Sequence, residues 1–160
     1  MKQTQKTASR QSTVVDPQRG LPASLQASLG YAVRRAQIHA YQHFAAVMGP
    51  ADVRPAQFAL LTLIHQHPGL PQSAAGELLG IEKGNLTGLL LELGERGWTE
   101  RHGSPVDRRA YSLHLTARGK THTRRLIRQH ERYEAAIAAR LSAAERAQLM
   151  SLLAKLVSKA

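Results

Sequence analysis

The sequence predicts a mainly α-helical fold with one small β-hairpin, and three features of the 160-residue chain lead to this prediction. Apolar residues recur at helical spacing through residues 22–48 and again after residue 116. A helix–glycine–helix pattern covers residues 74–96. Residues 98–116 are typical of two short strands joined by a basic turn. We therefore expect about six helices, with the hairpin directly after the helix pair.

The N-terminal part of the chain predicts a tail followed by one long helix. Residues 1–21 are polar, contain Pro17 and show no hydrophobic periodicity, so we expect a disordered basic tail. The helix is expected from Pro22 to Met48. Gly49 suits a left-handed cap there, and Pro50 blocks continuation. Such a helix is longer than one small core needs, so its ends are expected to bury apolar surface against a second chain.

Three shorter helices are expected next. Pro55 suits a first helical position, and the helix that it begins runs to a break at residues 67–69. A short helix from Pro71 to Leu79 and a longer one over residues 83–96 are separated by a turn at Gly80. The longer helix has an apolar stripe with the spacing of a buried face, formed by Leu86, Leu89, Leu90 and Leu93.

Two further helices are expected after the hairpin. Thr116 is a good N-cap for a helix that reaches about Arg140. Ser142 and Glu145 have the spacing of a capping box, which begins the last helix. We expect a second copy of the chain, or the first long helix, to cover the apolar stripe of that helix. The stripe consists of Leu149, Leu152, Leu153, Leu156 and Val157.

Composition limits the classes of function. The chain has 22 Lys and Arg against 11 Asp and Glu, a net charge of +11 that attracts polyanions, although a merely soluble basic surface has the same composition. Because cysteine is absent, disulfides and thiolate metal sites are excluded. Apolar runs are too short for a membrane span, and residues 1–21 lack the apolar core of a signal peptide, so we expect a cytoplasmic protein without a membrane partner.

The helix pair has the steric features of a helix-turn-helix. Ala75 and Gly76 supply small residues where the two helices cross, and Gly80 supplies the turn, although helical hairpins in other proteins share this spacing. The N-terminal part of the second helix presents five candidate DNA-binding residues, Lys83, Gly84, Asn85, Thr87 and Gly88. Asn85 can bind adenine, Lys83 guanine or phosphate, and Thr87 a thymine methyl group. The alternative is that these residues only cap and solubilise the helix.

The turn of the hairpin carries the remaining DNA-binding candidates. Asp107 and Arg109 are two residues apart, so on a strand they project to one side, where the carboxylate can orient the guanidinium. An oriented arginine at a hairpin tip suits the narrow minor groove of A·T-rich DNA. Arg108 points the other way and suits a phosphate. The alternative is an exposed ion pair of little energetic value.

Four stretches of the chain resemble the MarR-type (multiple antibiotic resistance regulator) winged helix-turn-helix transcription factors over about residues 25–157. They are R-P-A-Q-F-A-L-L at 54–61, the helix pair at 73–93, G-W-T-E-R at 97–101 and D-R-R-A-Y-S-L-H-L-T-A-R-G at 107–119. The resemblance implies that Asp107 and Arg109 belong to a DNA-binding wing. It also implies an intertwined homodimer built from N- and C-terminal helices, a pseudo-palindromic operator and an anionic effector. Arg54 stands where the family commonly has a Thr or Ser cap, and Asp52 is the alternative cap.

The candidate effector-binding residues are Arg35, His39, His43 and Phe58. His39 and His43 are four residues apart near the apolar face of the first helix, with Arg35 one turn earlier, and this polar set can hold a carboxylate or a phenolate. The alternatives are core histidines or a metal site, for which no nearby Asp, Glu or Cys completes the ligands. The resemblance makes an aromatic carboxylate, a phenolic compound or an aromatic acyl-CoA the expected effector.

The sequence therefore predicts a ligand-responsive repressor that binds double-stranded DNA as a homodimer. Residues 22–50 and 117–160 are expected to dimerise, and residues 51–116 to form the DNA-binding winged helix-turn-helix. The alternative is a basic architectural protein that binds nucleic acid with little sequence preference. We find no phosphate-binding glycine loop, nucleophile elbow or metal-ligand cluster, so we expect no enzyme activity, no cofactor and no metal.

Overall fold

The computed structural model describes residues 20–103 and 111–158 of the chain. Contacts within the chain divide it into two units, with the boundary between Ile38 and His39. The first unit contains α1 (Ala23–Gln26) and the beginning of α2 (Leu29–Met48). The predicted single helix from Pro22 is therefore wrong at its start. The amide of Tyr31 donates to Ser28 Oγ at 3.2 Å, so Ser28 caps a new helix instead of continuing the first.

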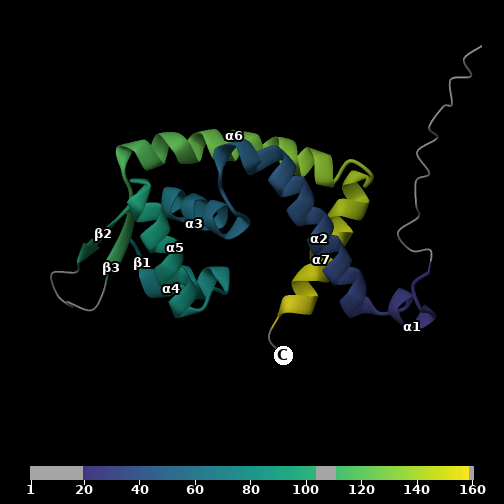
Figure 1. The fold of residues 1–160 in the computed structure, drawn as a ribbon. Helices are drawn as coiled ribbons and strands as arrows, with labels where there is room; N and C mark the ends of the chain where they lie inside the picture. Colours follow the sequence, from purple (N-terminus) through teal and green to yellow (C-terminus); the bar gives the residue numbers. More distant parts are fainter. Residues whose placement is uncertain (1–19, 104–110, 159–160) are drawn as a thin grey trace, which may run out of the picture. The chain divides into compact units, whose positions relative to one another are not determined.

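The second unit begins within α2 and contains all the later elements (Figure 1). A short 3₁₀ turn, η1 (Gly49–Ala51), leads into α3 (Pro55–Gln66), which is followed by β1 (Leu70–Pro71), α4 (Gln72–Leu79) and α5 (Lys83–Glu95). The hairpin strands are β2 (Thr99–Gly103) and β3 (Tyr111–Leu115), and two helices end the unit, α6 (Ala117–Ile137) and α7 (Ala143–Val157). The described residues thus contain seven α-helices, one more than expected, because α1 is separate from α2.

The three strands form one antiparallel sheet with the order β1-β3-β2. Thr99 pairs with Leu115 and Gly103 with Tyr111, so the predicted hairpin is present. The two-residue strand β1 was not predicted, and Pro71 belongs to it rather than to the following helix. A strand this short shows no alternation in sequence. It forms by pairing with the edge of β3 that β2 leaves open.

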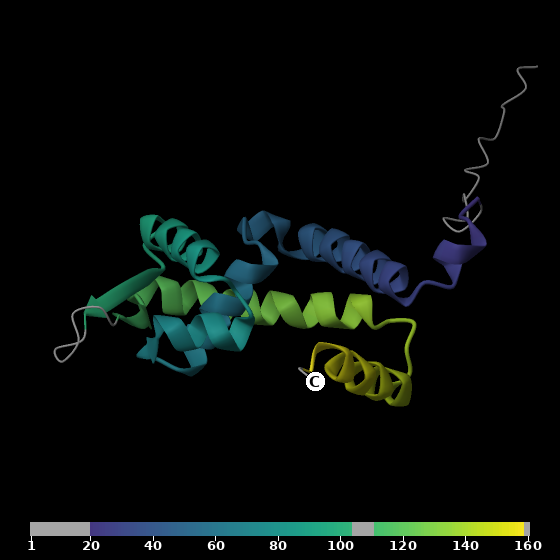
Figure 2. The same cartoon turned by 90° about the horizontal axis from the view of Figure 1, so that it is seen from below.

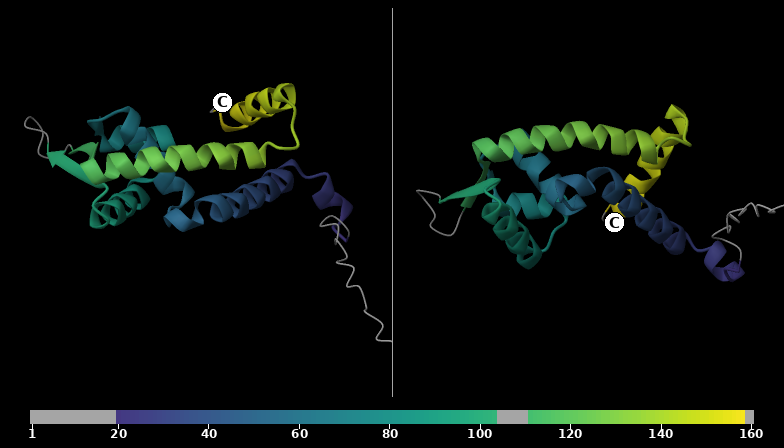
Figure 3. Two further views of the ribbon diagram at one scale, coloured as in Figure 1. Left: turned by 90° about the horizontal axis from the view of Figure 1, so that it is seen from above. Right: turned by 45° about the horizontal axis from the view of Figure 1, so that its top comes forward.

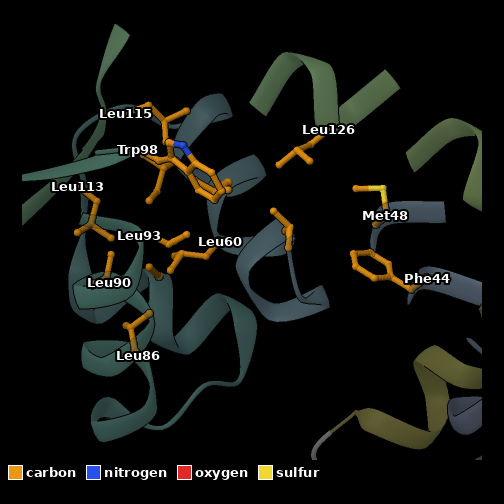
Figure 4. Close-up of a cluster of buried hydrophobic side chains, with 14 residues drawn as sticks. Phe44, Met48, Leu60, Leu86, Leu90, Leu93, Trp98, Leu113, Leu115 and Leu126 are labelled. Carbon is orange, nitrogen blue, oxygen red and sulfur yellow. The ribbon is translucent and has the colours of Figure 1, made fainter. Parts of the chain in front are cut away.

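One hydrophobic core holds the second unit together (Figure 4). Side chains from α3, α5 and the hairpin meet in it, and Leu126 of α6 adds to it from above in that view. The predicted stripe of α5 faces this core, with Leu86, Leu90 and Leu93 buried and Leu89 half-buried. The end of α2 contributes Phe44 and Met48. The core therefore fixes the orientation of α5 relative to the sheet.

The turns that connect the helices use left-handed backbone conformations. Gly80, between α4 and α5, has φ 62°, and Gly97, after α5, has φ 66°, as their predicted turn and cap positions require. The left-handed residue after α2 is Asp52, with φ 49°, and not Gly49 as predicted. The 3₁₀ turn intervenes, so the change of direction falls three residues later.

α6 extends without a break from the sheet to the turn before α7 (Figures 2 and 3). Its predicted N-cap is confirmed, since Thr116 Oγ1 accepts the amide of Gly119 at 2.9 Å, and the helix ends three residues before the predicted Arg140. The predicted capping box of α7 is also confirmed by the contacts between Ser142 and Glu145. Within the described ranges, no helix has the length and apolar character needed to cross a membrane.

Candidate nucleic-acid interface

The helix pair α4–α5 crosses at close range. A β-carbon added to Gly76 would lie 3.1 Å from the carbonyl oxygen of Ile81 and 3.3 Å from Leu86 Cδ2, so only a residue without a side chain fits there without a shift. Ala75 is fully buried beside it. The amide of Ile81 donates to the carbonyl of Gly76 at 2.9 Å and closes the turn around Gly80. The predicted small residues are thus at the crossing point, and they bring α5 close to α4.

The two faces of α5 have different environments. Its leucine stripe lies in the core, whereas the five predicted DNA-binding residues of its N-terminal half are all exposed: Lys83, Gly84, Asn85, Thr87 and Gly88. No β-carbon on Gly84 or Gly88 would meet an atom within 4 Å, so both glycines leave open space above the helix backbone. The structure therefore brings these five residues together on one surface, and their contact with DNA remains a prediction.

A buried glutamine fastens α5 to the beginning of α3. Gln57 is 1% exposed; its Oε1 accepts the amide of Arg54 at 3.0 Å, and its Nε2 donates to Glu92 Oε2 at 2.8 Å. The guanidinium of Arg54 pairs with the same carboxylate oxygen. Gln57 thus forms the capping contact at the start of α3 by accepting the amide of the N-cap residue Arg54, and Asp52 does not serve as the alternative cap. Sequence reasoning missed Gln57, whose only signal was a polar residue on the apolar side of the predicted helix.

A second contact holds the C-terminal end of α5. Arg96 donates to the carbonyl of Asp52 at 2.6 Å and to its carboxylate at 2.7 Å. Arg96 Cζ also lies 5.0 Å from the centre of the Trp98 ring, within cation–π range. Together with Gln57, this contact fixes the C-terminal half of α5 to the α2–α3 connection. The exposed N-terminal half is thereby presented from a rigid base.

An open groove runs beside the exposed half of α5 and reaches the hairpin strands. Its lining includes Gln72 at the start of α4, Lys83 and Thr87 of α5, and Arg101 and Tyr111 of the hairpin. Thr87 Oγ1 donates to the carbonyl of Lys83 at 2.9 Å, so its hydroxyl is occupied and its methyl group is left for other contacts. Sequence reasoning missed Gln72, Arg101 and Tyr111, because only the fold brings them to α5.

The predicted tip of the wing lies outside the described residues. Asp107, Arg108 and Arg109 all belong to residues 104–110, so their roles remain predictions. The strands that support the tip are described. On their outer face His102 and His114 stack at a ring distance of 4.3 Å, and Ser112 Oγ lies 3.2 Å from His114 Nε2.

The candidate effector residues fall into separate groups. The rings of His39 and His43 meet edge to face at 4.4 Å, whereas Arg35 belongs to the other unit of the chain. Phe58 stacks on His130 of α6 at a ring distance of 4.3 Å, and none of the ring contacts in the described residues joins Phe58 to His39 or His43. The predicted four-residue set is therefore not assembled by ring contacts.

Phe58 is part of an aromatic cluster that sequence reasoning missed, formed by Phe44, Phe58, His130 and Tyr133. The rings of Phe44 and Tyr133 are 5.4 Å apart, and those of His130 and Tyr133 are 5.1 Å apart. Burial lowers the pKa of His130 below its ordinary value of 6.5, although the nearby Glu134 carboxylate opposes this shift. Burial also raises the pKa of the Tyr133 hydroxyl, and Glu134 adds to that effect. Near neutral pH the cluster is therefore uncharged.

Polar atoms without partners lie on the same two helices. Among the described residues, four buried side-chain atoms have no hydrogen-bond partner. They are Thr62 Oγ1 of α3 and His122 Nε2, Thr123 Oγ1 and Gln129 Oε1 of α6. Such atoms are uncommon in folded proteins, because an unmade buried hydrogen bond is costly. Within the described residues, no group of three or more His, Cys, Asp or Glu side chains is placed to hold a metal ion.

The closely crossed helix pair, the exposed half of α5 and the adjoining hairpin define a winged helix-turn-helix protein of the DNA-binding type. Residues 53–111 match the family model described as MarR family. The chain is also 35% identical over 134 residues to the putative transcriptional regulatory protein for the hcr operon of Thauera aromatica, covering 83% of this chain and 81% of that protein. It belongs to the MarR family of transcriptional regulators.

Solved structures agree with this assignment. The transcriptional repressor CouR bound to a 23-mer DNA duplex is similar with a TM-score of 0.80 and 34% identity, covering 85% of this chain and 96% of that chain. CouR bound to p-coumaroyl-CoA is similar with a TM-score of 0.80 and 30% identity, covering 88% of this chain and 99% of that chain. The class of protein predicted from the sequence, a non-enzymatic winged-helix regulator, is thus confirmed.

Proposed function

We propose that the protein is a repressor that binds a pseudo-palindromic operator as a homodimer and releases it when a small anionic effector binds. The observation that carries this proposal is the presentation of α5, whose leucine face is packed in the core while Lys83, Asn85 and Thr87 are exposed. A recognition helix needs this combination, because base edges in the major groove are read by side chains on a rigid helix. The similar repressor CouR, whose structure contains a DNA duplex, supports the same mode of binding.

The apolar surface of α7 supports the homodimer. Leu152, Leu156 and Val157 are 50%, 53% and 82% exposed, and Leu149 and Leu153 are also exposed. The helix is held to α6 by an ion pair between Arg146 and Glu134 at 2.7 Å, so its leucines are presented on an ordered element. Exposed leucines at helical spacing are a typical dimer surface. We assign dimerisation to residues 22–50 and 117–160, which would place two α5 helices about 34 Å apart, in successive major grooves.

The effector is proposed to be an aromatic carboxylate, a phenolic compound or an aromatic acyl-CoA. An aromatic group would pack against the cluster of Phe44, Phe58, His130 and Tyr133, and His130 can donate a hydrogen bond to an anion. The unpartnered oxygens of Thr62 and Gln129 supply further polar groups on the same helices. CouR has been solved with p-coumaroyl-CoA, a ligand of this chemical kind. Binding would favour a spacing of the two α5 helices that does not fit the operator.

Competition binding tests the DNA-binding proposal. Selection from random duplexes should yield a two-fold symmetric site that is bound at least about 10³-fold more tightly than unrelated DNA. Arg109→Ala should weaken operator binding with little change in melting temperature. Near-equal affinity for all duplexes would instead favour the architectural alternative. A monomer at micromolar concentration in sedimentation would contradict the dimer.

The effector proposal needs its own test. Aromatic acids and their CoA thioesters should be titrated against the operator complex of the wild-type protein and of the variants His130→Ala and His39→Ala. We expect release in the wild type and a weaker response in His130→Ala. A loss confined to His39→Ala would move the site to the histidine pair of α2. Release by none of the compounds would contradict this class of effector.

A further inference from the structure

A group of basic side chains surrounds the single tryptophan of the chain, far from the exposed half of α5. It consists of Arg96, Trp98, Arg118, His122 and Arg125, and we call it the Trp98 cluster. All five residues belong to the second unit of the chain. From the Trp98 cluster we infer a binding site for a small phosphate-bearing anion, separate from the DNA-reading surface.

The aromatic centre of the cluster is a pair of stacked rings. Trp98 is 7% exposed, and the ring of His122 stacks on it at a distance of 4.0 Å with an interplanar angle of 20°. This stack is possible because Gly119, one turn earlier on α6, lies directly against the backbone of Trp98. His122 is therefore fixed in position, although Nε2 of its ring is buried and has no hydrogen-bond partner among the described residues.

Positive charges approach this centre from two elements. Arg96, at the end of α5, lies over the Trp98 ring at 5.0 Å. On α6, Arg118 and Arg125 precede and follow His122 by four and three residues, which places all three on one face of the helix. The side chain of Arg118 reaches back to Gly97, where its Nη1 would lie 4.0 Å from an added β-carbon. The guanidinium groups thus lie around the stacked rings and not along the length of α6.

The charges of the cluster are only partly balanced. Asp52 is the one carboxylate that an ion pair in the described residues joins to it, through Arg96, and this carboxylate is 86% exposed. Burial lowers the pKa of His122 below its ordinary value of 6.5, and the positive charges of the three arginines lower it further. This shift agrees with the geometry, because after burial its causes are the three arginines, of which Arg96 is paired with Asp52. A bound anion would reduce the repulsion between these charges.

The chemistry of the cluster favours a phosphate group over other anions. Three guanidinium groups supply many hydrogen-bond donors and a charge of about +3, which suits a dianion or a polyanion better than a single carboxylate. The recognition end of α5 does not reach this place. The helix has 13 residues, and at 1.5 Å per residue Lys83 and Arg96 are about 20 Å apart along its axis. A ligand in the cluster would therefore leave the exposed half of α5 free.

Intrinsic fluorescence tests this inference directly, because Trp98 is the only tryptophan of the protein. The full-length protein should be titrated with inorganic phosphate and with pyrophosphate, with potassium chloride at matched ionic strength as the reference. We expect a saturable change in emission, stronger for pyrophosphate. Lowering the pH should strengthen binding, since an anion stabilises the protonated form of His122.

Two matched variants separate a specific site from general charge. Arg118→Gln with Arg125→Gln removes two charges from the face of the cluster and should weaken pyrophosphate binding by at least tenfold. Arg124→Gln with Arg128→Gln removes two exposed charges from a different face of the same helix and should leave binding unchanged. Circular dichroism melting checks that both variants are folded.

Three outcomes would overturn the inference. A linear change in emission equal to that with chloride would mean general ionic screening. An equal loss of pyrophosphate binding in both double variants would mean the same. Displacement of pyrophosphate by one equivalent of duplex DNA would assign the arginines to DNA phosphates. The readout does not depend on operator recognition, so failure of the proposed repressor function would leave this test intact.

Discussion

Gly119 lies directly against the carbonyl group of Trp98, so that a β-carbon on Gly119 would be 1.9 Å from the carbonyl oxygen and 2.8 Å from the carbonyl carbon. The same carbonyl accepts the amide of Thr116 at 3.2 Å, and Thr116 Oγ1 donates to the carbonyl of Gly97 at 2.7 Å. These contacts join the first turn of α6 to the end of α5. They connect α5 to the long helix that leads to α7.

Replacement of Gly119 by alanine should therefore be strongly destabilising. The added methyl group meets backbone atoms that cannot rotate away, so α6 must shift from the sheet, at a cost of at least about 2 kcal/mol in unfolding free energy. Urea unfolding measures this cost. Gly94→Ala is the matched control, because its β-carbon meets only the Thr99 carbonyl at 3.9 Å in a helical position. That control should be neutral or stabilising by up to about 1 kcal/mol.

Replacement of Gln57 by leucine should destabilise the protein and also weaken operator binding. The change removes the acceptor for the amide of Arg54 and the donor to Glu92 while keeping most of the buried volume. Loss of these buried hydrogen bonds should lower the unfolding free energy by about 1–3 kcal/mol. Gln66→Leu, at the exposed end of the same helix, should change it little. Unchanged stability in Gln57→Leu would show that the contact with Glu92 does not hold α5.

Gly88→Ala should affect stability and DNA binding in opposite directions. The position is helical and open, so alanine should stabilise α5 by about 0.5–1 kcal/mol. If DNA approaches the backbone of α5, the methyl group should nevertheless weaken operator binding by about tenfold or more, equivalent to about 1.4 kcal/mol. Thermal melting and a fluorescence anisotropy titration give the two values. A stabilised variant with full operator affinity would place the DNA elsewhere.

Thr87 should act through its methyl group. Its hydroxyl already donates to the carbonyl of Lys83, so Thr87→Val should retain operator affinity within about twofold, whereas Thr87→Ser should lose any contact with a thymine methyl group. Operator titrations with both variants distinguish the two roles. The reverse order of affinities would mean that the hydroxyl contacts the DNA.

Stability should decrease as the pH falls below about 6.5. Burial lowers the pKa values of His122 and His130 in the folded protein from their ordinary value of 6.5, so the unfolded chain binds more protons in this range. The stability that their neutral forms contribute is complete above pH 6.5 and is lost as the pH passes down through the folded pKa values. Urea unfolding between about pH 5 and 8, on both sides of the ordinary histidine pKa, measures this loss. His130→Phe should flatten the dependence, whereas His67→Phe, at an exposed position, should not.

Local signals in the sequence were sufficient for most of the helices and for the helix pair. The caps at Thr116 and Ser142, the left-handed turn at Gly80 and the leucine stripe of α5 all act between residues a few positions apart, so they can be recognised without a fold. The first helix was predicted to begin too early, at Pro22, because the signal for the break before it is weak. Ser28 is a weak local signal within a stretch of otherwise helical spacing, and its cap became visible only in the structure.

The contacts that join distant segments had no such signal. Gln57 meets Glu92 across 35 positions, and β1 depends on the edge of β3. Phe58 was predicted beside the histidines of α2, but it stacks on His130 of a helix that lies more than sixty positions later in the sequence. Trp98 and His122 are likewise brought together only by the approach of α6 at Gly119.

The amino-acid sequence by itself determined the class of protein, most of its helices and the residues that α5 exposes, because periodicity, capping and turn chemistry act over short distances along the chain. The tertiary structure decided how that helix is held, which aromatic rings share a cluster and where the arginines gather. These features depend on packing between segments that are far apart in the sequence, and the pattern within any one segment does not contain that information.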